Sequence, residues 1–242
     1  MADSDIQVRM QVAKQATHIA GEELKRRFLA GERDAVAAEQ ASREAITVFL
    51  SQIYPNELLW GRGMDAAPSK SSFWVFDSLN GAENFSIGDP FFCSSVAWVQ
   101  DGGPMLGVVS NPMHNQQFTA VHKGGATLNR QQVTVRSTNK LDQAHVLASF
   151  GKKEIIPKLA AEVKQLKVRE SATLDMCSIA GGVHDAFVYF NLQPWEWIAA
   201  KLIVEEAGGT ITDLEGQPLT IRSEAALISN KELHTDLLKL VA

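Results

Sequence analysis

The order of its hydrophobic patterns constrains the fold of this 242-residue chain more than any single residue does. Residues 6–29 and 39–53 carry apolar side chains at near-helical spacing, and short strand-type runs follow between residues 73 and 136. From residue 146 onward, strand-type runs alternate with helical patterns. The first part therefore predicts two helices packed on a meandering sheet, and the second part predicts a smaller layered α/β unit.

Individual segments predict the elements and their connections. Residues 61–72 have turn composition without periodicity and predict a loop. The runs 94–100 and 105–110, joined by Asp-Gly-Gly-Pro, predict a β-hairpin. The remaining predicted strands are 73–76, 117–122, 132–136, 146–150, 186–190, 210–213 and 225–229, and the later helices are 153–165, 174–180, 195–207 and 231–241.

Composition bounds the domain count, the partners and the location of the chain. Without a linker rich in Pro, Gly or Ser, residues 1–242 are expected to form one domain with halves 1–140 and 141–242. The formal charge of −5 and the scattered basic residues argue against nucleic-acid binding. Two cysteines without metal-ligand or disulfide spacing fit a reducing compartment. With no signal peptide or membrane span in the pattern, we predict a cytoplasmic protein without a membrane partner.

Three short segments resemble the signatures of a known family. Residues 73–85, FWVFDSLNGAENF, are similar to a hydrophobic strand followed by Asp-Pro-(Ile/Leu)-Asp-Gly-Thr-x-Asn-Phe. Residues 194–209 are similar to Pro-Trp-Asp-x-Ala-Ala with a closing Glu-Ala-Gly-Gly, and residues 54–63 stand where the family has Phe-Pro and then Gly-Glu-Glu. The chain thus resembles the inositol monophosphatase-like family of Mg²⁺-dependent phosphatases over nearly its whole length.

The resemblance implies a fold and a chemistry. The fold is α/β (α+β), the layered α/β/α/β sandwich of the inositol monophosphatase and fructose-1,6-bisphosphatase type, and a homodimer is implied as well. Family members hydrolyse phosphate monoesters with Mg²⁺ ions, which prefer carboxylate oxygens and water as ligands. The ions generate a hydroxide and neutralise charge on the phosphoryl group, so the mechanism needs a cluster of acidic side chains.

By resemblance, the metal site comprises Asp77, Asn80, Glu196 and the backbone carbonyl of Leu79. Asp77 matches the bridging ligand of the family. Asn80 stands where a second Asp belongs, so it keeps an oxygen but loses the charge. Glu196 replaces the Asp of the second signature with a side chain longer by one methylene. The family resemblance implies Mg²⁺ as the cofactor. With these ligands substituted, the alternative that the protein uses no metal stays open.

Other positions of the implied site are substituted too. Arg62 and Gly63 stand in place of the two glutamates of Gly-Glu-Glu, so one position gains a cation and the other has no side-chain ligand. Ala82 replaces the Thr that helps to activate the attacking water, and Gln40 aligns with the Asp that pairs with that Thr. Tyr189 replaces an acidic residue that contacts substrate hydroxyls in several members. The implied catalytic set is Asp77, Asn80, Ala82 and Gln40.

The residues that survive predict a place for a phosphorylated small molecule. Gly81 and Ala82 would present backbone N–H groups at the start of a helix, where anions bind. Arg62 would supply positive charge through contacts to phosphate or to Asp77, although a loop position pointing to solvent is the simpler alternative. Glu196 completes the expected binding set.

Two functions of different classes remain open. In the first, the chain is a degenerate family member with little or no phosphatase activity that keeps the fold to bind a phosphorylated small molecule or a protein partner. In the second, it is a working Mg²⁺- or Mn²⁺-dependent phosphatase for inositol phosphate or another small phosphomonoester. That enzyme would use Asp77, Asn80, Glu196 and the Leu79 carbonyl, with Glu83 as a further donor. Affinity for a divalent ion separates the two.

Overall fold

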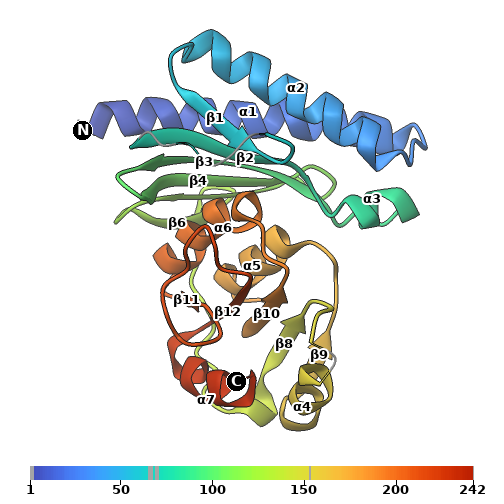
Figure 1. Ribbon diagram of the computed structural model, residues 1–242, viewed down its shortest axis with the longest axis vertical. Helices are drawn as coiled ribbons and strands as arrows, with labels where there is room; N and C mark the ends of the chain where they lie inside the picture. The colour runs from blue at the N-terminus through green and yellow to red at the C-terminus, as the bar shows by residue number, and fades with distance from the viewer. Residues whose placement is uncertain (1–2, 65–67, 69–70, 153, 242) are drawn as a thin grey trace.

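The structure, a computed structural model, describes residues 3–64, 68, 71–152 and 154–241. Parts of the predicted loop 61–72, the ends of the predicted domain 1–242 and the first residue of the predicted helix 153–165 lie outside these residues. Figure 1 shows the layers along the long axis: a helix pair, a large sheet, two helices, a smaller sheet, and two outer helices. The predicted layered α/β architecture is confirmed, with an additional helical layer at the end.

The two N-terminal helices, α1 (Asp3–Leu29) and α2 (Ala35–Ile53), cover one face of the large sheet. Helix α2 begins four residues earlier than predicted, because the side chain of Asp34 caps it by accepting a hydrogen bond from the N–H of Ala37 at 3.0 Å. The hydroxyl of Ser42 donates to the carbonyl of Ser78 at 2.8 Å and ties α2 to the sheet. The helix pair thereby holds the strand that carries Asp77.

The large sheet has seven strands in sequence order, antiparallel except for the first pair, which is parallel. Its strands are β1 (Leu58–Gly61), β2 (Ser72–Asn80), β3 (Cys93–Gln100), β4 (Gly103–Asn111), β5 (Gln116–Val121), β6 (Gly125–Leu128) and β7 (Gln131–Gln132). The predicted hairpin of β3 and β4 is confirmed. The other face of the sheet packs on α5 (Ala172–Ala180) and α6 (Pro194–Glu206), which fill the space between the two sheets.

Three strand predictions for this sheet were wrong. Strand β1 falls partly in the segment predicted as a loop, and β2 continues through Asn80 rather than ending at residue 76. Residues 77–80 look like a turn because they are polar, yet they are buried in the sheet, where a register shift marks a bulge. The predicted strand 132–136 is replaced by β6 and β7, which a two-residue turn connects.

The smaller sheet lies beyond α5 and α6, with strand order β11-β12-β10-β8-β9. Its strands are β8 (His145–Ala148), β9 (Gln165–Lys167), β10 (Ala186–Phe190), β11 (Thr210–Thr212) and β12 (Ala225–Ser229). The outer layer consists of α4 (Ile155–Glu162) and α7 (Lys231–Val241), which bury Leu159 and Leu237 against it. The predicted helix 153–165 is shorter than expected, because Val163 is extended and the chain turns into β9.

Among the described residues, no helix combines the length and the apolar composition that crossing a membrane requires. Cys93 and Cys177 are both buried free thiols.

Arg9 joins the helix pair to the edge of the large sheet. Its guanidinium donates two hydrogen bonds to the carboxylate of Glu57, at 2.8 and 2.6 Å. It also lies 4.6 Å from the ring centre of Tyr54 and 4.2 Å from that of Trp98. Because only 11% of this side chain is exposed, both the ion pair and the cation–π contacts are shielded from water.

Replacing Arg9 with Gln is therefore expected to lower the free energy of unfolding by about 2 kcal/mol, measured by urea denaturation. Arg26→Gln is the matched control, because Arg26 pairs with Glu23 on the surface with 59% of its side chain exposed. We expect little change in that control. Equal effects of the two substitutions would contradict the role assigned to Arg9.

Candidate functional site

The candidate site lies where β2 ends and the short helix α3 (Ala82–Ile87) begins. Asp77 is fully buried just before the bulge, and burial raises the pKa of its carboxyl, opposed by the charge of Arg62. Gly81 makes the turn into α3 with φ of +93°, and a Cβ there would lie 2.8 Å from the carbonyl oxygen of Phe91. Only glycine fits this turn.

The carboxamide of Asn80 is held in one orientation. Its oxygen accepts hydrogen bonds from the Thr173 N–H at 3.1 Å and the Ser171 hydroxyl at 2.9 Å, and its NH₂ group donates to Oδ2 of Asp77 at 3.1 Å. A backbone N–H can only donate, so the amide oxygen must face Thr173 and the NH₂ group must face Asp77. The two lone pairs of the oxygen are engaged, so this orientation does not fit the predicted role of Asn80 as a metal ligand.

Glu196 reaches the site from the first turn of α6. Its Oε2 accepts hydrogen bonds from the backbone N–H of Gln193 at 3.0 Å, which closes a capping box, and from the hydroxyl of Tyr189 at 3.2 Å. Its Oε1 accepts from Nη2 of Arg62 at 3.3 Å. Burial, and then repulsion by Asp77, raise the pKa of Glu196 to about 7. Tyr189, predicted near the substrate, thus contacts Glu196.

Arg62 points into the site rather than to solvent. Besides its 3.3 Å contact with Glu196, its guanidinium nitrogens lie 3.9 Å from Oδ2 of Asp77 and 3.9 Å from Oε1 of Glu39. The sequence suggested either a phosphate or Asp77 as the partner of Arg62. The structure places the carboxylate of Asp77 beside it. One guanidinium is therefore surrounded by three carboxylates from α2, β2 and α6.

The predicted role of Gln40 needs correction. Gln40 is exposed on α2, whereas Glu39, one residue earlier, is partly buried and faces Arg62. Burial raises the pKa of Glu39, partly offset by the charge of Arg62. Because consecutive residues of a helix point roughly 100° apart, Glu39 rather than Gln40 is directed toward Arg62.

Gly63 shapes the loop that carries Arg62. Its φ is +73°, and a Cβ at this position would lie 2.8 Å from Nη1 of Arg43. The same Nη1 donates to the carbonyl of Arg62 at 3.2 Å. An acidic side chain at position 63, as the family pattern has, would therefore strain the loop in its present conformation.

A cavity of about 180 Å³ opens beside these residues. Among the residues that line it are Arg62, Gly81, Ala82, Glu83, Ser149, Glu170, Ser171, Asp175, Tyr189 and Glu196. Ala82 and Glu83 therefore line the candidate site, and position 82 offers no hydroxyl. The side chain of Leu79 is buried in the core under α3, which leaves its carbonyl as a predicted ligand only.

The sequence analysis missed several residues of this cavity. Ser171 and Thr173 at the start of α5 position Asn80, and Asp175 one turn later is 1% exposed. The carboxylate of Asp175 accepts a hydrogen bond from Nε of Arg169 at 2.8 Å and forms an ion pair with Nη2 of the same residue at 2.7 Å. Burial is the largest effect on this carboxyl and raises its pKa to about 7 against the attraction of Arg169. Ser171 and Thr173 both precede the predicted helix 174–180, so no sequence signal placed them at the site.

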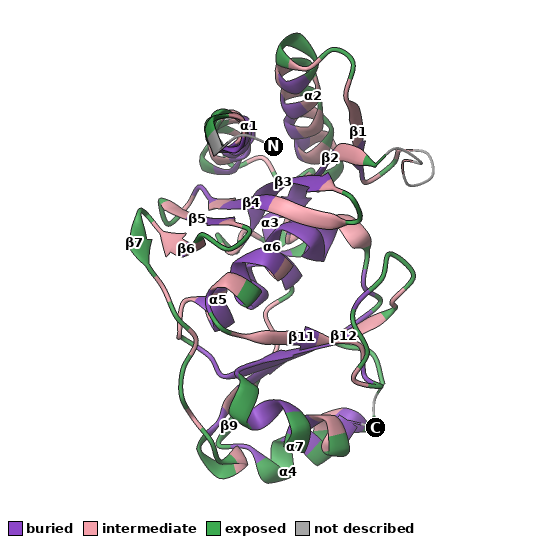
Figure 2. Ribbon diagram, turned by 90° about the vertical axis from the view of Figure 1, so that its left-hand side faces the viewer, coloured by how far each residue is buried: buried purple, intermediate pink, exposed green. Residues whose placement is uncertain are grey.

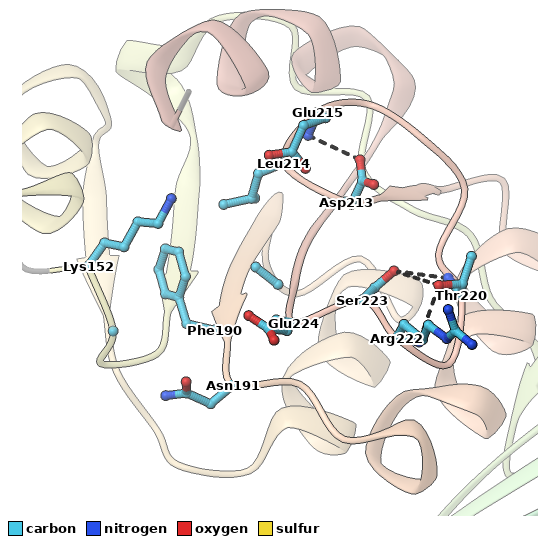
Figure 3. Close-up of a pocket in the computed structure, with 12 residues that line it drawn as sticks. Lys152, Phe190, Asn191, Asp213, Leu214, Glu215, Thr220, Arg222, Ser223 and Glu224 are labelled. Atoms are coloured by element: carbon cyan, nitrogen blue, oxygen red, sulfur yellow. Dashed lines mark hydrogen bonds between the residues drawn. The ribbon is translucent and has the colours of Figure 1, made fainter. Parts of the chain in front are cut away.

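A different cavity, of about 650 Å³, lies in the second half of the chain (Figure 3). Its walls carry Lys152, Phe190, Arg222 and Glu224 around the end of β10, with charges of both signs. None of the predicted site residues lines it.

Comparisons with known proteins agree with this architecture. The model of the inositol monophosphatase family matches residues 2–242. A fructose-1,6-bisphosphatase/inositol-1-monophosphatase of Aquifex aeolicus is 29% identical, with 95% of this chain and 94% of that protein aligned. The Nus factor SuhB of Pasteurella multocida is 33% identical, with 74% of this chain and 71% of that protein aligned. The chloroplastic phosphatase IMPL1 of Arabidopsis thaliana is 29% identical, with 84% of this chain and 60% of that protein aligned. The crystal structure of extragenic suppressor protein suhB from Bartonella henselae superposes with a TM-score of 0.92 at 29% identity, covering 97% and 99%.

The raised pKa of Asp175 predicts a pH-dependent stability. Because the folded state binds the Asp175 proton up to about pH 7 and the unfolded state releases it near pH 4, stability falls as pH rises through this window. Asp175→Asn removes the titrating group. The stability of this variant relative to the wild type should therefore improve by about 1 to 3 kcal/mol between pH 5 and pH 8. Urea denaturation at both pH values measures the difference.

Asp236→Asn serves as the control, since Asp236 pairs with Lys239 on the surface with 53% of its side chain exposed. Its stability relative to the wild type should stay constant over the same pH range. A constant difference for Asp175→Asn as well would mean that Asp175 remains ionised throughout.

Proposed function

The chain belongs to the inositol monophosphatase family, and we propose that it is a binding protein of that family without metal-dependent phosphatase activity. The observation that carries the proposal is the guanidinium of Arg62, which lies 3.3 to 3.9 Å from carboxylates of Glu196, Asp77 and Glu39. A fixed cation of the protein thus takes up the negative charge that metal ions would otherwise neutralise.

The donor set does not fit Mg²⁺. This ion demands near-octahedral oxygen coordination and gives up its water reluctantly. Oδ1 of Asp77 is buried without a hydrogen-bond partner and would suit a cation. However, the NH₂ group of Asn80 occupies Oδ2, and both oxygens of Glu196 already accept hydrogen bonds. Within the described residues, no group of three or more His, Cys, Asp or Glu side chains is placed to hold a metal ion.

The water-activating pair is also incomplete in this arrangement. Position 82 carries a methyl group without a hydroxyl, and Gln40 is exposed on α2. A metal ion next to Arg62 would in addition meet a fixed positive charge. Hydrolysis by the chemistry of the family would need both a metal-bound hydroxide and its positioning partners, so we expect the wild type to release no phosphate.

The lining of the cavity supports a ligand rich in hydroxyl groups. Glu83 and Glu170 are acceptors, Ser149 and Tyr189 carry hydroxyls, and Arg62 is the cation among the lining residues. Carboxylates outnumber cations, so a free phosphate dianion is disfavoured, whereas polyol hydroxyls can donate to the carboxylates. A Staphylococcal relative of 25% identity has been solved with inositol monophosphate bound. We propose a small polyol that carries at most one phosphate, placed at Arg62.

The resemblance predicts a homodimer, and the sequence pattern predicts a cytoplasmic location; both stay predictions. Sedimentation of the purified chain tests the first. A working metalloenzyme is the competing proposal, supported by the unpaired Oδ1 of Asp77.

Divalent ions distinguish the two proposals. We expect neither Mg²⁺ nor Mn²⁺ to raise the melting temperature of the wild type, and no phosphate release from a panel of phosphomonoesters with either ion or with chelator. The double variant Arg62→Gln/Asn80→Asp removes the resident cation and supplies a second carboxylate. In this variant, saturating Mg²⁺ should stabilise the fold by about 2 to 3 kcal/mol at a hundredfold excess over its Kd.

Asn80→Asp alone is the matched control, and it should respond more weakly because Arg62 remains in place. Phosphate release by the wild type that needs metal and disappears in Asp77→Asn would overturn the proposal and establish a rearranged phosphatase.

A further inference from the structure

A third cavity, of about 340 Å³, lies between α1 and the far end of the large sheet. Helix α1 packs across β3 and β4, and β5 to β7 extend beyond it at the edge of the sheet (Figure 2). Strand alternation turns Phe118 into the core and Thr119 toward the α1 side. Seven residues from α1, β5, β6 and the following turn line this cavity: Gln11, Lys14, Gln117, Thr119, Thr127, Asn129 and Arg130.

The charge of this cavity is of one sign. Lys14 and Arg130 are its charged residues, and no Asp or Glu belongs to its lining. Neither cation takes part in any of the ion pairs found among the described residues. In a chain with a formal charge of −5, two cations that line one cavity without a carboxylate stand out. The cavity therefore attracts anions, in contrast to the acidic cavity beside Arg62.

The backbone at Arg130 is strained. Asn129 and Arg130 form the two-residue turn between β6 and β7, with φ values of +49° and +71°. Such type I′ turns strongly prefer Asn-Gly, because glycine adopts positive φ without steric cost. An arginine at the second position costs about 1 kcal/mol relative to glycine. This cost is consistent with a functional use of the guanidinium.

The turn and the neighbouring donors are fixed in place. The side chain of Asn129 accepts from the N–H of Gln117 at 2.8 Å and donates to the carbonyl of Asn115 at 2.9 Å. The hydroxyls of Thr119 and Thr127 lie 2.9 Å apart, so one donates to the other and the second keeps a free proton. The cavity thus offers one hydroxyl donor beside the ammonium and the guanidinium.

We propose that this cavity is a binding site for a phosphate or diphosphate group, separate from the site at Asp77 and independent of any metal. Arg130 binds two oxygens through its planar guanidinium, and Lys14 supplies the second positive charge from α1. The Thr hydroxyl that keeps its proton donates to a remaining oxygen. The phosphate can be free or part of a small phosphorylated molecule, because both present the same oxygens.

Calorimetric titration with inorganic pyrophosphate, at low salt and with chelator, tests the proposal. The wild type should bind, and Arg130→Gly should weaken the affinity at least about tenfold, equivalent to the loss of one charge-assisted contact. Because glycine relieves the strained turn, the free variant should melt at a higher temperature than the wild type, which separates lost binding from misfolding. Lys14→Gln should weaken the affinity as well.

Arg62→Gln is the control for the other cavity and should bind pyrophosphate as the wild type does. Orthophosphate and a sugar monophosphate, titrated separately, distinguish a free ion from a phosphorylated molecule as the natural ligand. Unchanged pyrophosphate affinity in Arg130→Gly, or binding lost in Arg62→Gln alone, would overturn the proposal.

Discussion

The buried carboxylate of Asp77 is the constraint on which the site depends. It lies at the bulged end of β2, under α2 and against the first turn of α6, where a bare charge would be costly. Groups of the protein itself stabilise this charge. The NH₂ group of Asn80 donates a hydrogen bond to Asp77, and the guanidinium of Arg62 lies between Asp77 and Glu196. The layers of the fold bring these groups together from segments more than a hundred residues apart.

The layers and most elements could be predicted from the sequence, because helices and central strands have strong hydrophobic periodicity. Polar but buried segments could not, since residues 77–80 look like a turn until the sheet pairs them. The position of Asp77 and Glu196 followed from the motifs. The orientation of the Asn80 amide depends on Thr173, which is distant in sequence, and the choice of Glu39 over Gln40 depends on the rotation of α2.

The cavity beside Arg62 and the cavity beside α1 differ in charge, and this difference suits different ligands. The one beside Arg62 has more carboxylates than cations and favours hydroxyl groups, whereas the one beside α1 has two cations and no carboxylate. As proposed, the cavity beside Arg62 takes a polyol with at most one phosphate, and the cavity beside α1 takes a phosphate or diphosphate group. Neither site, as proposed, requires a divalent ion.

Anomalous diffraction from crystals soaked in Mn²⁺ tests the central claim most directly. If Arg62 takes the place of the metal, the map will show its guanidinium between Glu196 and Asp77 and no anomalous peak at either carboxylate. An Mn²⁺ peak within coordination distance of Oδ1 of Asp77, with Arg62 displaced toward solvent, would contradict the claim and return the chain to the metal-dependent phosphatases.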